Sequence, residues 1–501
     1  MNEQGTLDRL EPGMVIPYGG NRYTRVDAEL ARAFQAGDRL LVVQESGALL
    51  RIPGQVDEVV RARVGEARAA FEALAQARPG AVDRFYETFA DALERDEVWA
   101  QVVAANEEDV RRAQQRGRST TRLKVSDKMR AAMIEGLRVW PGLAAQDDRV
   151  LGRVDHGDWQ VDVLRVPLGV VAFVFEGRPN VLVDACGVLA SGNTAVLRIG
   201  SDALGTASAL VRHALRPSLE AAGLPQGAVS LVEVEDRAAG WAMFSDNRLA
   251  LAVARGSGTA VMQLSSVARQ AGVPVSAHGT GGAWLVADPS ADGERFERAV
   301  RHSLDRKVCN TLNVCCIVRE GVADLMPRFL RAIDEAGAAL SGAPRLHVTP
   351  SAQPFVPAEL FGRRTLVRRA EGDVDEPYAS PLPEARLGQE WEWEETPELS
   401  LVVVESVDEA VALFNRYSPR FVASLIASDP QAHQRFRLRI DAPFVGDGFT
   451  RWVDGQYALG KPELGLSNWE HGRLLGRGGV LTGADLAAVR LVATTAQEQH
   501  R

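Results

Sequence analysis

The chain has 501 residues, more than one ordinary domain requires, so two or three domains are expected. Its 46% hydrophobic and 25% charged residues are typical of a globular protein, and no window approaches about 18 uninterrupted apolar residues, which argues against a membrane span. The net charge of −9 argues against general nucleic-acid binding, and four cysteines without paired spacing argue against a disulfide framework or a metal site. Because residues 1–13 do not read as a signal peptide, we expect a cytoplasmic protein.

Residues 1–55 read as a small N-terminal appendage. Within it, residues 38–53 are expected to form two short strands around a turn at Ser46-Gly47. From Val56 to Trp140 the pattern becomes helical, with further helices at about 80–94 and 97–116. Apolar residues recur at steps of three and four and are expected on one helix face: Val59, Val60, Val64, Ala67 and Phe71.

From about residue 148 to 330, strands alternate with helices, which predicts an α/β fold with a parallel sheet. A β-hairpin at 150–166 comes first. Further strands are expected at 169–175, 194–199, 229–234, 249–254, 273–276 and 284–287. Ligands of such sheets bind at the carboxyl ends of the strands, so the residues that follow these strands are candidates for a site.

Two glycine-containing segments lie at such strand ends. Arg255-Gly256-Ser257-Gly258 either opens a helix whose first amides hold a phosphate or is an ordinary strand-to-helix turn. Ala277-His278-Gly279 offers His278 as an acid or base, with a polar loop residue as the alternative. Neither segment completes a known phosphate-binding fingerprint, and the chain has no Walker A motif.

Cys309 stands in an unusual setting. Arg306 and Lys307 precede it, Asn310 follows it, and an apolar stretch with strand character comes next. Neighbouring cations favour the thiolate, which is the nucleophilic form of cysteine. The alternative is a small core residue, which is the interpretation we give to Cys315 and Cys316.

Several motifs occur in a fixed order along residues 56–495: Glu176-Gly-Arg-Pro-Asn180, Ser191-Gly-Asn193, Ala277-His-Gly279, Val308-Cys-Asn310, Asn415-Arg-Tyr417 and Thr450-Arg451. Together they resemble the glutamate-5-semialdehyde dehydrogenase (γ-glutamyl phosphate reductase) family of the aldehyde dehydrogenase superfamily. The resemblance implies an aldehyde-dehydrogenase-like α/β fold. Residues 56–282 would form the nucleotide-binding domain, 283–450 the catalytic domain, and 451–501 a C-terminal return segment.

The resemblance also implies a homo-oligomer, either a dimer or a tetramer. The hairpin at 150–166 would serve oligomerisation, and a C-terminal strand at about 486–494 could pair with a partner's hairpin. The other expected partners are a small-molecule acyl phosphate or aldehyde and an upstream kinase; no nucleic acid and no membrane are expected.

The mechanism that the resemblance implies begins with attack of the Cys309 thiolate on an activated acyl group such as an acyl phosphate. Hydride from a reduced nicotinamide would then convert the thioacyl group to an aldehyde. The backbone N–H of Cys309 and the side chains of Asn180 and Asn310 are candidate donors to the oxyanion. Substrate-binding candidates are Arg178, Arg306, Thr450 and Arg451; Arg178 has a buried structural cation as its alternative interpretation.

By the same resemblance, His278 takes the place of a glutamate that activates water in aldehyde-oxidising relatives. The absence of this glutamate favours an acyl reductase over an acid-forming dehydrogenase. Arg198 and Ser201 follow a strand near the expected adenosine ribose and would tolerate a 2′-phosphate, so NADPH is the expected cofactor. The pyrophosphate side is assigned to Arg255, Gly256 and Ser257, and the nicotinamide ribose to Glu395.

The chain departs from the family pattern at several places. Asn313 stands where the family has an acidic residue, and Phe421-Val-Ala423 where it tends to have polar and charged residues. Residues 445–450 differ from the family's asparagine-bearing strand, and residues 1–55 are extra. We therefore expect a relative with a shifted acyl substrate. An NAD(P)-dependent aldehyde-oxidising dehydrogenase and a non-catalytic nucleotide-binding protein remain the alternatives.

Overall fold

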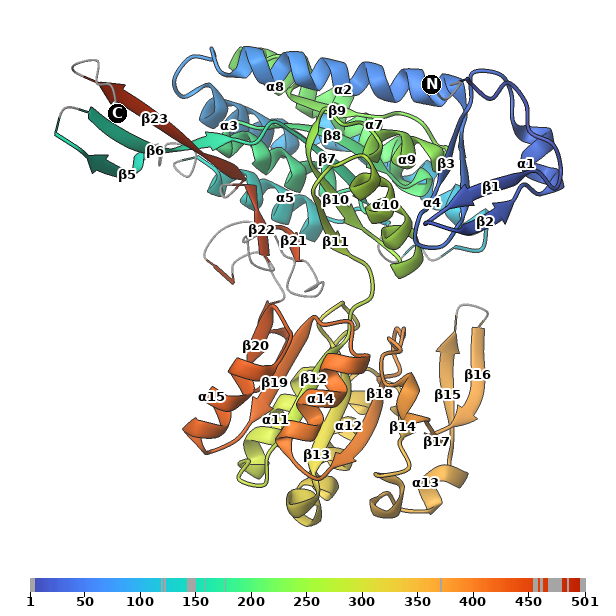
Figure 1. The fold of residues 1–501 in the computed structure, drawn as a ribbon. Helices are drawn as coiled ribbons and strands as arrows, with labels where there is room; N and C mark the ends of the chain where they lie inside the picture. The colour runs from blue at the N-terminus through green and yellow to red at the C-terminus, as the bar shows by residue number, and fades with distance from the viewer. Residues whose placement is uncertain are drawn as a thin grey trace. The chain divides into compact units, whose positions relative to one another are not determined.

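The structure is a computed structural model that describes residues 5–118, 120, 123–141, 150–157, 159–175, 177–369, 372–453, 458–459, 463–466, 480–483 and 486–495. The chain forms two compact units (Figure 1). Unit 1 comprises residues 1–279, 461–465 and 481–501, and unit 2 comprises residues 280–460 and 466–480. The chain passes between the units close to the predicted domain boundary at 282–283. Most of the predicted return segment between 454 and 479 lies outside the described residues.

The N-terminal residues belong to unit 1. They form strands β1 (Val15–Tyr18), β2 (Arg22–Arg25), β3 (Arg39–Val42) and β4 (Leu49–Ile52), and helix α1 (Ala28–Ala33). β3 and β4 pair antiparallel, which confirms the two strands predicted around Ser46-Gly47. Leu10, Val26 and Phe34 form a small core of their own.

Four helices follow: α2 (Gly54–Leu74), α3 (Ala81–Glu94), α4 (Asp96–Gln115) and α5 (Asp127–Val139). The buried face of α2 consists of Val60, Val64, Ala67, Ala70 and Leu74, with Asp57 at its start. The predicted face was wrong at Val59, which is 42% exposed. Adjacent residues point about 100° apart on a helix, and because the buried face of α2 is centred on Val60, Val64 and Ala67, Val59 points towards solvent.

Unit 1 contains a parallel five-stranded sheet in the order β11-β10-β7-β8-β9. Its strands are β7 (Val170–Phe175), β8 (Thr194–Ile199), β9 (Val229–Leu231), β10 (Leu249–Arg255) and β11 (Val275–His278). The helices between them are α6 (Val181–Ala185), α7 (Leu204–Leu210), α8 (Arg216–Ala222), α9 (Ala238–Phe244) and α10 (Gly258–Gln270). All six residues of the central strand β7 are buried, as its continuous apolar sequence predicts.

The predicted hairpin is present as β5 (Val150–Asp155) and β6 (Trp159–Pro167), which pair antiparallel. The C-terminal strand β23 (Ala487–Thr495) pairs with β6 along its whole length. The strand thus extends the hairpin of its own chain, and its pairing with a partner's hairpin stays a prediction. The pairing satisfies backbone groups that would otherwise be exposed along the edge of β6.

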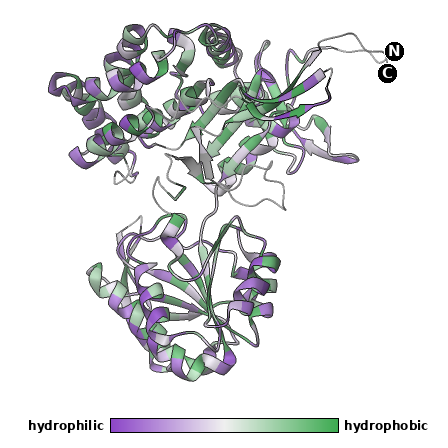
Figure 2. Ribbon diagram, turned by 90° about the vertical axis from the view of Figure 1, so that its left-hand side faces the viewer, coloured by the Kyte–Doolittle hydropathy of each residue, from purple (hydrophilic) through white to green (hydrophobic). Residues whose placement is uncertain are grey.

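Unit 2 is built on a parallel seven-stranded sheet in the order β17-β14-β18-β13-β12-β19-β20. Its strands are β12 (Ala283–Ala287), β13 (Leu312–Val318), β14 (Arg345–Val348), β17 (Ala379–Pro381), β18 (Glu398–Val404), β19 (Val422–Ile426) and β20 (Phe444–Gly446). Its helices are α11 (Gly293–His302), α12 (Val322–Ala339), α13 (Glu359–Gly362), α14 (Val407–Tyr417) and α15 (Pro430–Arg439). In Figure 2 the strands of the two parallel sheets are mainly hydrophobic, whereas the surrounding helices carry both hydrophobic and hydrophilic residues.

Unit 2 also carries an antiparallel hairpin, β15 (Arg364–Arg369) and β16 (Gly372–Pro377). A short pair, β21 (Glu463–Leu466) and β22 (Val480–Thr482), completes the described strands. Among the described residues, no helix is long and apolar enough to cross a membrane. The two parallel sheets confirm the predicted fold class.

Candidate active site

Cys309 lies in the turn between α11 and β13 in unit 2. The backbone of this turn is held from several sides: the N–H of Gly282 donates to the Cys309 carbonyl at 2.7 Å, and the Thr311 hydroxyl donates to the Arg306 carbonyl at 2.7 Å. The N–H of Val308 in turn donates to the Thr311 hydroxyl at 2.9 Å. We refer to residues 306–311 as the nucleophile turn. These bonds place the Cys309 thiol at the amino end of a buried strand, on a fixed backbone.

Cys309 differs from the other three cysteines by its exposure. Cys186, Cys315 and Cys316 are fully buried, whereas Cys309 is only half-buried. Burial raises the pKa of each of the three buried thiols, which keeps them protonated. Cys309 is therefore the one cysteine of the chain that the structure presents for reaction, and Cys315 and Cys316 are core residues of β13 as predicted.

A carboxylate that the sequence did not single out lies beside the nucleophile turn. Glu390 accepts a hydrogen bond from the N–H of Gly281, and its other oxygen lies 2.5 Å from Nζ of Lys307. A Cβ added to Gly281 would lie 2.8 Å from both the Cα of Cys309 and a carboxylate oxygen of Glu390. Lys307, one of the two cations that precede the thiol in sequence, is thus paired with an acidic group.

Asn313 holds the loop that carries Glu390. Its Nδ2 donates to the carbonyl of Gln389 at 2.8 Å, and its Oδ1 accepts from the N–H of Trp391 at 3.0 Å. Both polar ends of this buried side chain are therefore used by the loop. The amide of Asn313 thus binds backbone groups of the protein itself, and the shifted substrate inferred from the missing acidic residue stays a prediction.

A buried group of charged residues contacts the loop that carries Glu390, on the side of Trp391. The ring of His347 stacks on Trp391, with 3.6 Å between ring centroids, and its Nε2 lies 2.7 Å from Glu398. Burial lowers the pKa of His347. Burial alone would raise the pKa of Glu398, but hydrogen bonds with His347 and Arg369 outweigh it and hold the value at about 2. The loop is thus fixed by stacking, by amide hydrogen bonds and by an ionised carboxylate.

The structure brings four predicted residues to the nucleophile turn. Asn310 is fully buried, and neither polar atom of its side chain has a hydrogen-bond partner among the described residues. The hydroxyl of Thr450 donates to the Asn310 carbonyl at 2.9 Å. Arg451 is buried and paired with Asp305. Arg306 is exposed at the start of the turn.

In unit 1, predicted residues gather at the carboxyl ends of β10 and β11. Arg255 and His278 are register partners at the ends of the two strands. The guanidinium of Arg255 donates to the Ser276 carbonyl at 2.8 Å, which ties these strand ends together. Gly256 and Ser257 follow, and Ser257 is the residue before α10. A Cβ on Gly279 would lie 2.8 Å from the Cα of Gly258, so β11 ends against the start of this helix.

The ends of β7 and β8 carry the remaining predicted residues of unit 1. Arg198 donates to the Glu235 carbonyl at 3.1 Å, while its buried Nε has no hydrogen-bond partner among the described residues. Burial lowers the pKa of Arg198. Ser201 begins a short 3-10 turn after β8. Arg178 is exposed after β7, and the amide of Asn180 donates to Asp184 at 3.1 Å.

Glu395 lies in unit 2, three residues before β18, and is exposed. The acidic residue that contacts the nucleophile turn is Glu390, with Glu392 3.6 Å from Lys307. Sequence reasoning missed Glu390 because 83 residues separate it from Lys307 and no local pattern connects them. The only feature of the sequence that could have drawn attention to Glu390 is the alternation of three acidic residues and two tryptophans within 390–394.

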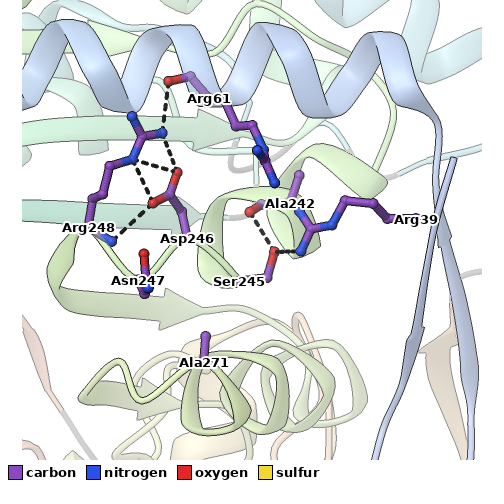
Figure 3. Close-up of a pocket in the computed structure, with 8 residues that line it drawn as sticks. All are labelled: Arg39, Arg61, Ala242, Ser245, Asp246, Asn247, Arg248 and Ala271. Atoms are coloured by element: carbon purple, nitrogen blue, oxygen red, sulfur yellow. Dashed lines mark hydrogen bonds and ion pairs between the residues drawn. The ribbon is translucent and has the colours of Figure 1, made fainter. Parts of the chain in front are cut away.

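A cavity of about 440 Å³ lies elsewhere in unit 1, beside α2 and α9 (Figure 3). Its lining includes Arg39, Arg61 and Arg248. Asp57 pairs with the first two, and Asp246 pairs with Arg248. None of the predicted site residues lines this cavity, and we assign no ligand to it.

Both the sequence and the structure of the chain are similar to those of known proteins. The sequence model of the Aldehyde dehydrogenase family matches residues 45–345. A gamma-glutamyl phosphate reductase from Thermus thermophilus is 33% identical over 414 residues, which cover 80% of this chain and 91% of the relative. One from Rhizobium johnstonii is 29% identical over 442 residues, covering 85% and 94%. The crystal structure of gamma-glutamyl phosphate reductase from Thermotoga maritima has a TM-score of 0.75 at 24% identity, covering 88% of this chain and 100% of that one.

Proposed function

The chain belongs to the aldehyde dehydrogenase family, with gamma-glutamyl phosphate reductases among its relatives, and we propose that it reduces an acyl phosphate to an aldehyde through a thioacyl intermediate on Cys309. The observation that carries this proposal is the half-buried Cys309 on a hydrogen-bonded turn, in a chain whose other cysteines are fully buried. The relatives' substrate, γ-glutamyl phosphate, is one candidate acyl donor.

The first step is attack of the Cys309 thiolate on the acyl carbon. A carbon–sulfur bond forms, the carbon–oxygen bond to phosphate breaks, and inorganic phosphate leaves with the electron pair. A nicotinamide nucleotide in its reduced form supplies, when bound, the hydride for the second step. As the aldehyde is released, the carbon–sulfur bond breaks and the electron pair returns to the Cys309 thiolate.

Both steps place negative charge on the acyl oxygen, so the site needs hydrogen-bond donors. The amide of Asn310 fits this role because it is fully buried, next to Cys309, and without a hydrogen-bond partner among the described residues. The backbone N–H of Cys309 and the amide of Asn180 are the other donors we propose. Arg306 and Arg178, both exposed, would bind the anionic groups of the substrate, and Thr450 and Arg451 would position it.

The strand ends of unit 1 fit a nicotinamide nucleotide. The buried Nε of Arg198, which has no hydrogen-bond partner among the described residues, and the nearby Ser201 would donate hydrogen bonds to the ribose and its 2′-phosphate, which favours NADPH. The amides at the start of the 13-residue helix α10, with Gly256 and Ser257, would hold the pyrophosphate, and Arg255 would fix the strand end beneath them. Glu395 is kept as the proposed contact of the nicotinamide ribose, and His278 as an acid–base group.

We also propose that the protein forms a homo-oligomer through the sheet β23-β6-β5. Its outer residues include Val489 and Leu491, which are 63% and 67% exposed, on an antiparallel sheet with two open edges. An upstream kinase that supplies the acyl phosphate stays a prediction.

The reverse reaction tests the proposed function. An aldehyde panel led by glutamate 5-semialdehyde is incubated with NADP or NAD, with and without phosphate or arsenate, and reduced nucleotide is followed by absorbance. We expect nucleotide reduction that requires phosphate or arsenate, is faster with NADP, and is abolished by Cys309→Ala. Phosphate-independent release of the free acid would show an aldehyde-oxidising dehydrogenase instead.

A further inference from the structure

Two stretches that are far apart in the sequence meet beside the nucleophile in unit 2. Phe421 directly precedes strand β19, which begins at Val422, and Phe444 begins strand β20. These residues form one apolar cluster with Ala283 and Val453, and Cys309 packs against that cluster. Cys309 is therefore in contact with a hydrophobic surface within unit 2.

Aromatic rings extend this surface outwards. Phe421 and Phe444 meet edge to face with 5.3 Å between ring centroids, and Phe444 meets Trp452 in the same way at 6.2 Å. The two phenylalanines are buried, whereas Trp452 is 41% exposed. Gly446 makes room for the indole, because a Cβ at this position would lie 2.8 Å from its Nε1.

The exposed end of this aromatic series is tied to the nucleophile turn. Thr450 donates its hydroxyl to the Asn310 carbonyl and its N–H to the Ser303 hydroxyl at 3.0 Å. Phe449 and Trp452 stand on either side of the Thr450-Arg451 pair, and Phe449 is 40% exposed. Large aromatic side chains that remain this exposed on a fixed turn are suited to contact a bound molecule.

The charges around the turn do not favour a zwitterionic acyl group. Lys307 is paired with Glu390 and Arg451 with Asp305, and we assign the exposed Arg306 to the phosphate of the acyl donor. A γ-glutamyl group carries an ammonium and a carboxylate that lose hydration on binding and need partners in the site. The rings can contact an ammonium but donate no hydrogen bond to a carboxylate, and they are better suited to bury methylene or aryl groups.

We propose that the aromatic surface formed by Phe421, Phe444 and Trp452, together with the exposed Phe449 three residues before Trp452 in the chain, receives the acyl chain of the substrate, and that this chain is apolar. The proposal rests on the proposed function, because it assigns the acyl group that Cys309 receives. Phe449 and Trp452 are the specificity-determining residues, since their exposed rings leave area for a ligand to cover. Phe421 and Phe444 support them from within the core.

The test compares aldehydes in the phosphate-dependent oxidative reaction. Linear aldehydes from acetaldehyde to hexanal, benzaldehyde, succinic semialdehyde and glutamate 5-semialdehyde are ranked by kcat/KM with NADP. We expect kcat/KM to rise by about fourfold per added methylene along the linear series. Both carboxylate-bearing aldehydes should fall below hexanal. A preference for glutamate 5-semialdehyde would overturn the apolar assignment, while no phosphate-dependent turnover of any aldehyde would refute the proposed function itself.

Substitutions of the exposed aromatic residues test whether they cause the preference for longer apolar aldehydes. Phe449→Ser should lower kcat/KM for hexanal about tenfold or more and leave acetaldehyde little changed, since acetaldehyde is too short to cover the ring. Trp452→Ala should act in the same direction. Leu438→Ser is the matched control, because Leu438 is 80% exposed on α15, at a distance in sequence from the turn. An equal loss for every aldehyde would show a structural effect and contradict the specificity role.

A binding measurement does not depend on turnover. Hexanamide and glutamine are stable amides of an apolar acyl group and of the γ-glutamyl group. Alkylation of Cys309 by iodoacetamide should be slowed by hexanamide in the wild type and less so in Phe449→Ser. Protection by glutamine alone, or equal or no protection by the two amides, would overturn the proposal.

Discussion

The ammonium of Lys307 and the carboxylate of Glu390 lie 2.5 Å apart, although 83 residues separate them in the chain. Only 6% of the Lys307 side chain and 14% of the Glu390 side chain are exposed, so the pair is little screened by solvent. A cation near a thiol favours the thiolate, and an anion disfavours it. The pair therefore balances the charge that Cys309 experiences two residues away.

Replacement of either partner should shift the reactivity of Cys309 in opposite directions. Glu390→Gln removes the anion, so the midpoint of the pH dependence of Cys309 alkylation should move to lower pH. Lys307→Met removes the cation and should move the midpoint to higher pH. Glu392→Gln is the control, because Glu392 lies 3.6 Å from Lys307 but is 71% exposed, and it should shift the midpoint less. An unchanged midpoint in both variants would contradict the electrostatic coupling.

Asn313→Ala should destabilise the protein without changing which aldehyde it prefers. The change leaves the Trp391 N–H and the Gln389 carbonyl without their partners, which costs about 1–3 kcal/mol of unfolding free energy. Urea denaturation measures the loss, and the ratio of kcat/KM between hexanal and glutamate 5-semialdehyde measures the preference. A changed ratio with unchanged stability would return Asn313 to the role that its sequence position suggested.

Gly281→Ala should displace the nucleophile turn. An added Cβ would lie 2.8 Å from the Cα of Cys309 and closer still to its carbonyl oxygen, which backbone atoms cannot relieve without a shift. We expect a loss of phosphate-dependent activity of tenfold or more with the chain still folded by circular dichroism. Gly362→Ala is the matched control, because nothing lies within 4 Å of a Cβ there. Full activity in Gly281→Ala would mean that the turn is not fixed as described.

Sequence patterns were sufficient for the fold because its elements are locally encoded. The continuous apolar residues of β7 and the alternation of strands and helices are signals within a few residues, and both were confirmed. Cys309 could be proposed as the nucleophile because Arg306, Lys307 and Asn310 lie within three residues of it in the chain. Glu390 could not be found, because its contacts with Gly281 and Lys307 arise only when three separate loops come together. For the same reason, the sequence did not predict that Phe421, Phe444 and Cys309 pack in one cluster.

Acidification should weaken the folded state through the group behind the Glu390 loop. The folded pKa of His347 is depressed by burial, so the unfolded chain takes up more protons below pH 6.5 and stability falls there. The pKa of Glu398 is also depressed, to about 2, so a second loss follows as pH falls from 4.5 towards that value. Urea denaturation at a series of pH values should show both losses. His347→Gln should remove the first, whereas His302→Gln, at an exposed position, should not. Stability that rises on acidification would contradict this assignment.

The most direct test of the account is the mass of the protein after exposure to an acyl phosphate without nucleotide. With butyryl phosphate, the account predicts one added butyryl group per chain, located by peptide mapping on Cys309. The group should be absent in Cys309→Ala and released as butanal when NADPH is added. Acylation at another residue, or none in a folded protein that reduces butyryl phosphate, would contradict the account.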